Sequence, residues 1–374
     1  MIKEQYNQLP RTTFRWMKVN HLELAPQKII PAVHMQPQEH HTGDVVVRFY
    51  DGDSTLPLGD FAGANAEALS QALHHSTTGC CIEIAPRATG AVWLTYTLSE
   101  EIPQIVAQLQ IKAGPGSDVS IYLTFEGDAE QGNVNFLNYV EAGEAAKVKI
   151  SKIQLHGKHV RHIEHRYAKT EKQSFVEYVS AEIGSRETIV YYKTDLLKES
   201  GKFHSNTMYM GNDKQIFDFS YWVPQQGEQT ETDILTTGSL MGSAKKYFRG
   251  TIDFLRGGKK AVGSESDVCL LLSPGAHSIS IPLLLCKEDD VVGNHASSAG
   301  QIDQDKLFYL MSRGFSENGA QLIIVESNIR PVIDKLGDPD MENKVLQAVR
   351  EKMQYCHKKG DCHVKCSKRF PHID

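Results

Sequence analysis

Short stretches in which apolar and polar residues alternate dominate the middle of the chain, over residues 78–300. Examples are AVWLTYTL, VSIYLTF, VNFLNYV, KVKISKIQL and IFDFSYWV, which are rich in β-branched and aromatic residues. Gly, Asn, Asp or charged residues separate them. This period-two pattern predicts roughly a dozen or more short strands, each with one face toward an interior. Helical patterns are nearly absent there, which argues against βαβ units and leaves a sandwich, a propeller or a parallel β-helix.

The spacing of apolar residues changes after His295 and predicts a small helical region over residues 301–355. Asp303 can act as the N-cap of a first helix, and Gly314 can end it. One face of this helix is apolar, and its residues are Leu307, Leu310 and Met311.

Two further helices are expected in the same region. Ser316 can cap the second helix, and Pro331 is expected to end it because proline cannot continue the hydrogen-bond pattern. Asp340 is the expected cap of the third helix. The third helix has an apolar stripe formed by Met341, Val345, Leu346, Val349 and Met353.

The N-terminal region, residues 1–77, has a mixed pattern and is expected to be partly helical. GANAEALSQALHHS has helical spacing, whereas TTFRWMKVNHLEL fits either a short helix or an extended arm. Proline and histidine between Pro26 and His41 indicate a linker or a surface loop.

Composition narrows the class of protein. The 374 residues carry a net charge of −6 without a long basic run, which argues against nucleic acid and anionic membranes as partners. No stretch approaches the about 20 apolar residues of a membrane span, and the first residues lack the apolar core of a secretory signal. The seven cysteines are an odd number in a long chain, which favours free thiols. We expect a soluble, cytoplasmic protein.

Four motifs in one continuous order carry a resemblance to a known family. They are FRGTIDF, LLLSPGA, LFYLMSRG, and an Asp-Asp-Val followed by a histidine and then Gly-Gln-Ile-Asp. Together they span about seventy residues, from Tyr247 to Ala320. This region resembles the core of the SufB/SufD family, the scaffold proteins of the SUF iron–sulfur cluster assembly system.

The resemblance implies a fold and a set of partners. The implied fold is a right-handed parallel β-helix flanked by an N-terminal region and a small C-terminal helical domain. In the family, two such subunits associate through their β-helices, and a transient iron–sulfur cluster is thought to form where they meet. The C-terminal helices of each subunit dock one SufC, an ABC-type ATPase, and ATP binding pulls the two SufC subunits together.

Three positions distinguish the two branches of the family. SufB-like members carry a cysteine where this chain has Pro274, which cannot ligate iron. SufD-like members place a histidine after the Asp-Asp-Val, and here that residue is His295. They often carry a cysteine two residues earlier, where this chain has Gly293. The chain therefore resembles SufD, and its expected cluster-assembly interface includes His295 and His277.

A neutral imidazole suits iron, but one histidine cannot complete a four-ligand site. The partner chain is therefore expected to contribute thiolates. The partner is either a SufB-like subunit or a second copy of this chain. His277 also fits a plain strand-edge histidine in a polar turn.

The first C-terminal helix is expected to dock SufC, because it has more large apolar side chains than one face of a small helix needs. Internal packing among the three helices competes for some of them. The expected docking residues are Leu307, Phe308, Leu310, Met311 and Arg313.

The last nineteen residues, 356–374, form a tail rich in soft metal ligands. They could hold zinc or iron, although their spacing matches no common zinc finger. The competing interpretation is a basic tail with incidental thiols. The candidate ligands are Cys356, His357, Cys362, His363 and Cys366.

Two other clusters favour structural interpretations. The run HGKHVRHIEH is expected to be a strand with solvent-exposed histidines at positions 156, 159, 162 and 165. Buried packing is expected for Cys80, Cys81, Cys269 and Cys286.

No P-loop, GxSxG or HExxH motif is present, so no nucleotide is expected on this chain and ATP hydrolysis is assigned to the partner. The chain is thus expected to be a scaffold and not an enzyme. Two alternatives remain: a carbohydrate-active β-helix enzyme, which would need acidic residues on one face, and a stand-alone metal-binding protein that uses only the tail.

Overall fold

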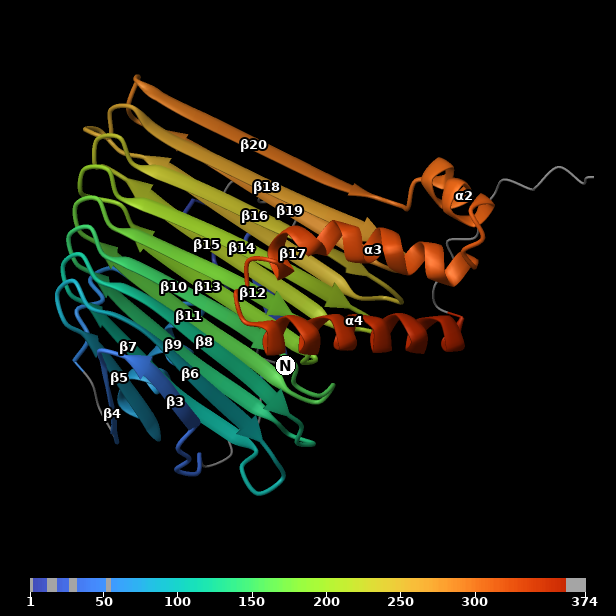
Figure 1. Cartoon of the computed structure of the whole chain (residues 1–374), viewed down its shortest axis with the longest axis horizontal. Coiled ribbons are helices and arrows are strands. Elements are labelled where there is room, and N and C mark those ends of the chain that lie inside the picture. The colour runs from blue at the N-terminus through green and yellow to red at the C-terminus, as the bar shows by residue number, and fades with distance from the viewer. Residues whose placement is uncertain (1–2, 12–18, 27–31, 52–54, 361–374) are drawn as a thin grey trace, which may run out of the picture.

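The computed structural model describes residues 3–11, 19–26, 32–51 and 55–360, and a stack of β-coils forms its centre (Figure 1). Two nine-stranded sheets make up the stack, and a separate two-stranded sheet packs against it. Eight successive coils build the stack, each with one strand in either large sheet. The parallel β-helix is therefore confirmed, and the sandwich and the propeller are excluded.

The even-numbered strands form one large sheet together with β3. They are β3 (Gln38–Gly43), β6 (Thr89–Leu98), β8 (Asp118–Gly127), β10 (Lys147–Gln154), β12 (Phe175–Glu182), β14 (Lys202–Gly211), β16 (Glu231–Leu240), β18 (Ala261–Leu271) and β20 (Val291–Gly300).

The odd-numbered strands form the other large sheet together with β4. They are β4 (Val45–Tyr50), β5 (Thr78–Ile84), β7 (Gln104–Ala113), β9 (Asn133–Ala142), β11 (Arg161–Thr170), β13 (Glu187–Asp195), β15 (Ile216–Gln225), β17 (Lys245–Phe254) and β19 (His277–Cys286). At the start of the stack β3 pairs antiparallel with β6, and β4 pairs antiparallel with β5; all later pairs in the two sheets are parallel.

Rows of like side chains run through the interior of the stack. Val92, Ile121 and Ile150 occupy matching register positions on β6, β8 and β10, and all three are buried. Burying each such side chain contributes roughly 1.5–3 kcal/mol. The coil needs only an apolar side chain at each inward position, so stretches of different sequence that share this alternation can form it.

The turns that lead from the odd sheet to the even sheet repeat one backbone conformation. In seven successive turns, one residue has a positive φ and donates its backbone N–H to a carbonyl of the next turn. Six of the seven are not glycine, asparagine or aspartate, and these six have φ between 55° and 62°. The seven residues are Arg87, Gly116, Ala145, Gln173, Ser200, Gln229 and Lys260.

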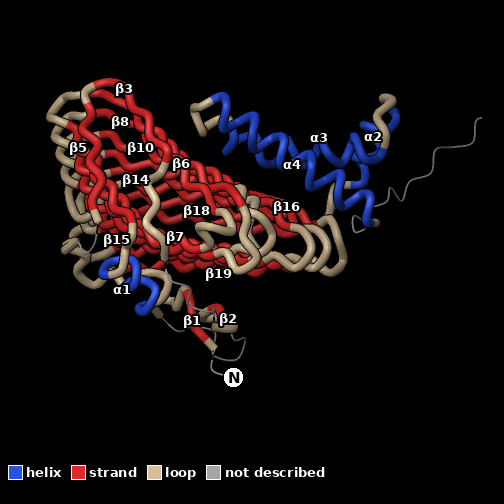
Figure 2. The backbone as a smooth tube through the Cα atoms, turned by 90° about the horizontal axis from the view of Figure 1, so that it is seen from below, coloured by secondary structure: helices blue, strands red, loops and turns tan. Residues whose placement is uncertain are grey.

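The N-terminal region covers the outer face of the odd sheet (Figure 2). It includes β1 (Glu4–Tyr6), β2 (Leu22–Leu24) and the predicted helix α1 (Ala66–His74). The Asn65 side chain caps α1 by accepting hydrogen bonds from the first turn. Residues 12–18, part of the stretch expected as a short helix or an arm, lie outside the described residues.

Helices α3 (Glu317–Ile333) and α4 (Pro339–Lys359) cover the outer face of the even sheet, and α2 (Gln304–Ser312) packs against α3 beyond the end of β20 (Figure 1). Three side chains of the sheet hold the connection between α3 and α4. Trp93 Nε1 donates to the Asp338 carboxylate at 2.9 Å, and the Tyr122 and Ser151 hydroxyls donate to carbonyls of Gly337 and Leu336. The helices are thus bonded directly to the coils.

The caps at Asp303 and Ser316 are confirmed, but two other helix boundaries were predicted wrongly. α3 continues past Pro331 to Ile333, because a proline in the last turn removes only one hydrogen bond of the helix. Asp338 caps α4 in place of Asp340, since its side chain accepts from the Met341 N–H at 2.9 Å.

The expected exposure of the histidine run is wrong for three of its four members. His156, His162 and His165 are buried, and only His159 is exposed. Both faces of β11 are covered, one by the interior of the stack and the other by the N-terminal region. His165 lies on the second face, where its Nδ1 accepts from the Ala64 N–H at 2.9 Å.

The cysteines of the stack differ in exposure. Cys80 and Cys269 are buried as expected, and burial raises the pKa of the Cys80 thiol to about 12. Cys286 is exposed, contrary to expectation, because it ends β19 in the last coil. Among the described residues, none of the helices combines the length and the apolar character that crossing a bilayer requires.

Candidate functional site

The last coil of the stack is open. Within the described chain, β19 pairs only with β17 and β20 only with β18, so each strand leaves one edge unpaired. Nine of the ten residues of β20 are exposed. Two neighbouring edge strands of ten residues present free backbone donors and acceptors, which is a template for pairing with another chain.

The sequence of β20, VVGNHASSAG, explains why this coil stays open. After its two valines it has only small or polar residues, so it cannot build a hydrophobic cap of its own. Val292 on β20 and Val262 on β18 are 54% and 40% exposed. An exposed edge of this length with apolar side chains is unusual for a monomer surface and indicates an interface.

His295 lies near the middle of this open strand, and its side chain is exposed. It is in register with Glu265 of β18, whose side chain is buried in the stack. Side chains at matching positions of parallel neighbours lie on the same face of the sheet. His295 is therefore on the inward face of the last coil, at the mouth of the stack.

Buried ionisable groups lie one coil below His295. Glu265 is 4% exposed, and neither carboxylate oxygen has a hydrogen-bond partner within the described part of the chain. Burial, reinforced by the nearby Asp267 and opposed by Lys246, raises the pKa of Glu265 to about 8. Lys246 itself forms a buried ion pair with Asp267.

Gly250 of the FRGTIDF motif makes room for the Glu265 carboxylate. A Cβ at this position would lie 2.1 Å from Oε2 of Glu265, closer than any stable contact allows. Residues 3–11, 19–26, 32–51 and 55–360 contain no group of three or more side chains placed to hold a metal ion.

His277 is exposed on the same coil as His295 but not beside it. It is the first residue of β19, nine residues before the end of that strand, whereas His295 is four residues after the start of β20. The turn joins those two strand ends, so the histidines are offset by about 16 Å along the strands. The structure places both at the open end but does not bring them together.

The residues predicted on α2 are divided between core and surface. Leu307 is fully buried between the helices and the even sheet. Phe308, Leu310 and Met311 are half-buried, and the exposed Arg313 guanidinium lies 5.2 Å from the ring centre of Tyr309.

Three exposed apolar residues of α2, α3 and their connection were missed by sequence reasoning. Tyr309 is 56% exposed, Phe315 48% and Ile323 38%. We call them, together with the half-buried Phe308 and Met311, the helical patch. The excess of large residues in LFYLMSRGF signals such a patch, but only the packing shows which of them remain outside.

The tail residues within the described part of the chain do not form a metal site. Cys356 is buried in the core beneath α4, and the half-buried His357 has its Nε2 3.0 Å from Oε1 of Gln321. Cys362, His363 and Cys366 lie outside the described residues.

Comparison with known proteins places these features in context. The family model for the SufBD core domain of SUF system FeS cluster assembly matches residues 96–328. The iron–sulfur cluster assembly protein SufD of Bacillus subtilis is 26% identical over 221 residues, which are 59% of this chain and 51% of that protein.

Two SufBD family iron–sulfur cluster assembly proteins are also similar. The protein of Mycobacterium tuberculosis is 26% identical over 194 residues, or 51% of this chain and 23% of that protein. The protein of Staphylococcus epidermidis is 28% identical over 164 residues, or 43% and 35%. The chain thus spans about half the length of the Bacillus protein and less of the other two.

Proposed function

The chain belongs to the SufBD family of the SUF iron–sulfur cluster assembly system and is SufD-like. From this premise we propose that it is a scaffold subunit. It pairs with a SufB-like subunit through the open end of its β-helix and docks the SufC ATPase through the helical patch. It has no catalytic turnover of its own, and SufC supplies ATP hydrolysis. The observation that carries this proposal is the last coil, whose outer edge no strand of the described residues covers, with His295 at its mouth.

Strand addition is the simplest way to close this coil. A partner strand along the free edge of β19 or β20 would satisfy the backbone groups that the described chain leaves unpaired. A rigid coil on the partner would extend the stack and bury the exposed valines. The interface would then enclose the space into which His295 points.

Ligand chemistry favours a SufB-like partner over a second copy. Iron–sulfur clusters are held mainly by thiolates, and this chain has Pro274 and Gly293 where relatives are expected to carry cysteines. Two copies would contribute two imidazoles but lack those thiolates. A partner that brings cysteine to the mouth would complete a site in which His295 supplies one neutral nitrogen.

The helical patch suits a partner that moves. α3 and α4 share a core with the outer face of the even sheet, and the connection between them is bonded to three of its strands. Displacement of a protein docked on the patch would therefore be transmitted to the stiff stack. Nucleotide-driven movement of SufC could in this way change the geometry at the mouth.

Charged substitutions in the helical patch should abolish SufC binding. The double variant Tyr309→Asp/Phe315→Asp is expected to weaken the complex at least about 100-fold, because exposed aromatic residues are common hot spots and a carboxylate there would be desolvated. Surface plasmon resonance with purified SufC measures the loss. Leu197→Asp is the matched control, since Leu197 is 42% exposed in a turn far from the patch. Equal affinity of the double variant and wild type would reject this docking surface.

Removing the imidazole at position 295 should lower cluster formation without preventing assembly. His295→Ala, in the complete complex, is expected to carry less than about half of the wild-type iron and acid-labile sulfide, because one ligand of the shared site is lost. Metal and sulfide analysis after size-exclusion chromatography tests both parts. His277→Ala, on the same coil but offset, should have the smaller effect. Unchanged iron and sulfide in His295→Ala would remove His295 from the chemistry.

A further inference from the structure

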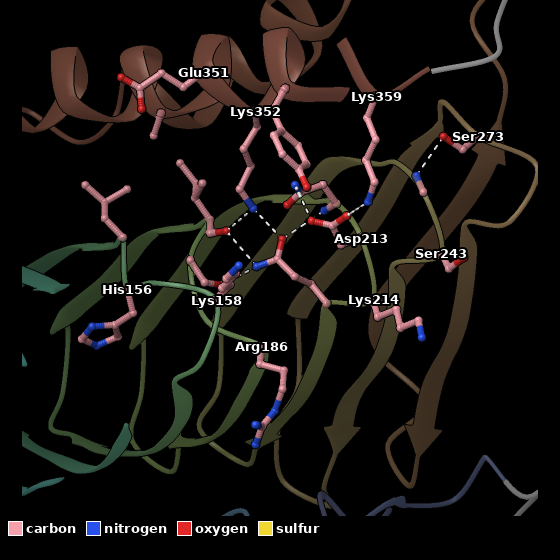
Figure 3. Close-up of a pocket in the computed structure, with 18 of the residues that line it drawn as sticks. His156, Lys158, Arg186, Asp213, Lys214, Ser243, Ser273, Glu351, Lys352 and Lys359 are labelled. Carbon is pink, nitrogen blue, oxygen red and sulfur yellow. Dashed lines mark hydrogen bonds and ion pairs between the residues drawn. The ribbon is translucent and has the colours of Figure 1, made fainter. Parts of the chain in front are cut away.

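A cavity of about 1330 Å³ lies between α4 and the turns that lead from even to odd strands (Figure 3). Five successive turns contribute to its wall, from the one after β10 to the one after β18. The lining of this cavity, which we call the turn cavity, includes no residue of β20 or of the helical patch, but it reaches Pro274 and Gly275 in the turn that enters the last coil. Its volume exceeds the range of about 300–1,000 Å³ that is typical for small-molecule sites.

Lysines of α4 bridge the turn cavity. Lys344 pairs with Glu126 at 3.4 Å and Lys359 pairs with Asp213 at 2.5 Å. Between them, Lys352 Nζ donates to two turn carbonyls and to Oε1 of Gln215, and Figure 3 shows it reaching down from the helix. The helix is therefore held over the turns by long polar side chains, which keep the space beneath it open.

A second set of cations lies on the opposite wall. Lys158, Arg186 and Lys214 occupy the turns of three successive coils and are exposed. Among the described residues, neither Lys158 nor Lys214 has a side-chain acceptor, and the Arg186 guanidinium reaches only Glu187, at 3.4 Å.

The lining has an excess of positive charge in a chain whose net charge is −6. Burial lowers the pKa of Lys352 to about 7, so this lysine adds less than a full positive charge at neutral pH. Five other lysines and arginines and three carboxylates line the cavity. Two of those carboxylates, on Glu126 and Asp213, are already paired with the lysines of α4.

Stacking three cations with one carboxylate among them, that of Glu187 beside Arg186, is unfavourable. Neighbouring coils are about 4.8 Å apart, and like charges on adjacent rungs repel. His156 beside them does not add charge at neutral pH, because burial lowers its pKa well below the ordinary value. A row of cations with only one neighbouring carboxylate, at the wall of a cavity, is the arrangement that a multiply charged anion stabilises.

We propose that the turn cavity binds a small molecule carrying an oligophosphate, with Lys158, Arg186 and Lys214 along the phosphate chain. The three residues span about 10 Å along the stack, the scale of consecutive phosphates with their oxygens. Arginine can grip a phosphate with two parallel hydrogen bonds, and lysine adds a point charge. The exposed Ser243 hydroxyl at the next turn is a further donor. The volume leaves room for an organic group beyond the phosphates.

Calorimetric titration of the full-length chain with inorganic tripolyphosphate tests the proposal. Wild type is expected to bind saturably with one site, more weakly as salt rises. The triple variant Lys158→Gln/Arg186→Gln/Lys214→Gln is expected to bind at least 30-fold more weakly. A matched triple variant, Lys112→Gln/Lys147→Gln/Lys172→Gln, removes the same charge from exposed positions at the other turns and should bind like wild type.

A second measurement locates the ligand independently of the variants. Tripolyphosphate should protect Lys158 and Lys214 from acetylation in wild type, while Lys172 remains reactive. Absence of saturable binding, equal weakening by both triple variants, or protection of none of the cavity lysines would overturn the proposal. An oligoglutamate peptide that binds where tripolyphosphate does not would also overturn it, in favour of an acidic protein segment.

Discussion

Replacing Arg249 with methionine is expected to destabilise the chain by about 3–5 kcal/mol. The guanidinium is fully buried between β17 and the N-terminal segment. It pairs with the Asp218 carboxylate at 2.6 Å and donates to the Val19 carbonyl at 2.8 Å. Asn7 donates to the same carboxylate at 2.6 Å. Loss of the guanidinium would leave Asp218 buried with one neutral donor and would release the N-terminal segment from the sheet.

Urea unfolding at pH 7 measures the effect. Burial already raises the pKa of Asp218 despite its pairing with Arg249, so the carboxylate tolerates its site only because of that partner. The double variant Asp218→Asn/Arg249→Met should recover much of the loss, since it removes both charges. Arg256→Met, at an exposed position of the following turn, is the control. A loss below about 1 kcal/mol for Arg249→Met would show that the pair is not stabilising.

The second large effect is acid destabilisation through His165. Burial lowers the pKa of this imidazole to about 3, and nearby Glu164 opposes the shift only in part. Ala64 donates its N–H to Nδ1, so Nε2 carries the proton and donates to the side-chain Oδ1 of Asn135 at 3.0 Å. A second proton on Nδ1 would face the Ala64 N–H. The folded chain therefore keeps His165 neutral, whereas the unfolded chain protonates it below about pH 6.5.

The sign follows from proton linkage. The stability that depends on neutral His165 is complete above pH 6.5 and is lost as the pH falls toward 3. The expected loss is about 2 kcal/mol at pH 5 and about 4 kcal/mol near pH 3. His156 and His162 are also buried with lowered pKa values, so they add to the loss in the same direction.

Comparing urea unfolding at pH 8 and pH 5 isolates the contribution of His165. His165→Gln keeps an acceptor and a donor without a titratable ring, so its stability should fall by about 2 kcal/mol less than that of wild type between these pH values. His159→Gln, at the exposed member of the run, should retain the full wild-type pH dependence. Identical pH dependence of wild type and His165→Gln would show that this histidine is not the acid-sensitive group.

The strand pattern predicted the coils but not their number or order. Alternation reveals which residues face inward, whereas the choice between sandwich, propeller and β-helix depends on which strands pair. The repeat that all coils share is a left-handed backbone conformation in each turn from an odd to an even strand, which the side chains of the sequence do not reveal. Residues as different as Arg87, Ala145 and Lys260 occupy the same left-handed position in successive turns. A sequence scan for similar side chains cannot detect that repeat.

The histidine run shows the limit of single-strand reasoning. Its setting among strand-like stretches predicts a strand, although β11 begins only at Arg161, and exposure depends on which segment covers the outer face. His165 is buried because the N-terminal region folds across β11, with Gly63 so close that an added Cβ would lie 2.5 Å from the imidazole. That contact joins residues about a hundred positions apart, which local periodicity does not encode.

The candidate site was accessible only in part. The family resemblance singled out His295, and alternation in GSESDVC could have placed Glu265 and Asp267 on one inward face. Their position one coil below His295 follows from register, which only the structure supplies. The helical patch was foreseen as a region, but the burial of Leu307 and the exposure of Tyr309 depend on how the helices pack against the even sheet.

The hydrogen bonds between coils also shape how the molecule can vary. Each interior coil forms backbone hydrogen bonds only with the coil before it and the coil after it. Energetic coupling therefore acts between nearest neighbours and weakens with distance along the stack. A flaw at one extremity is therefore attenuated before it reaches the other. Substitutions can thus change the end of the stack that contacts a partner, or a whole coil can be added, while the opposite end keeps its structure.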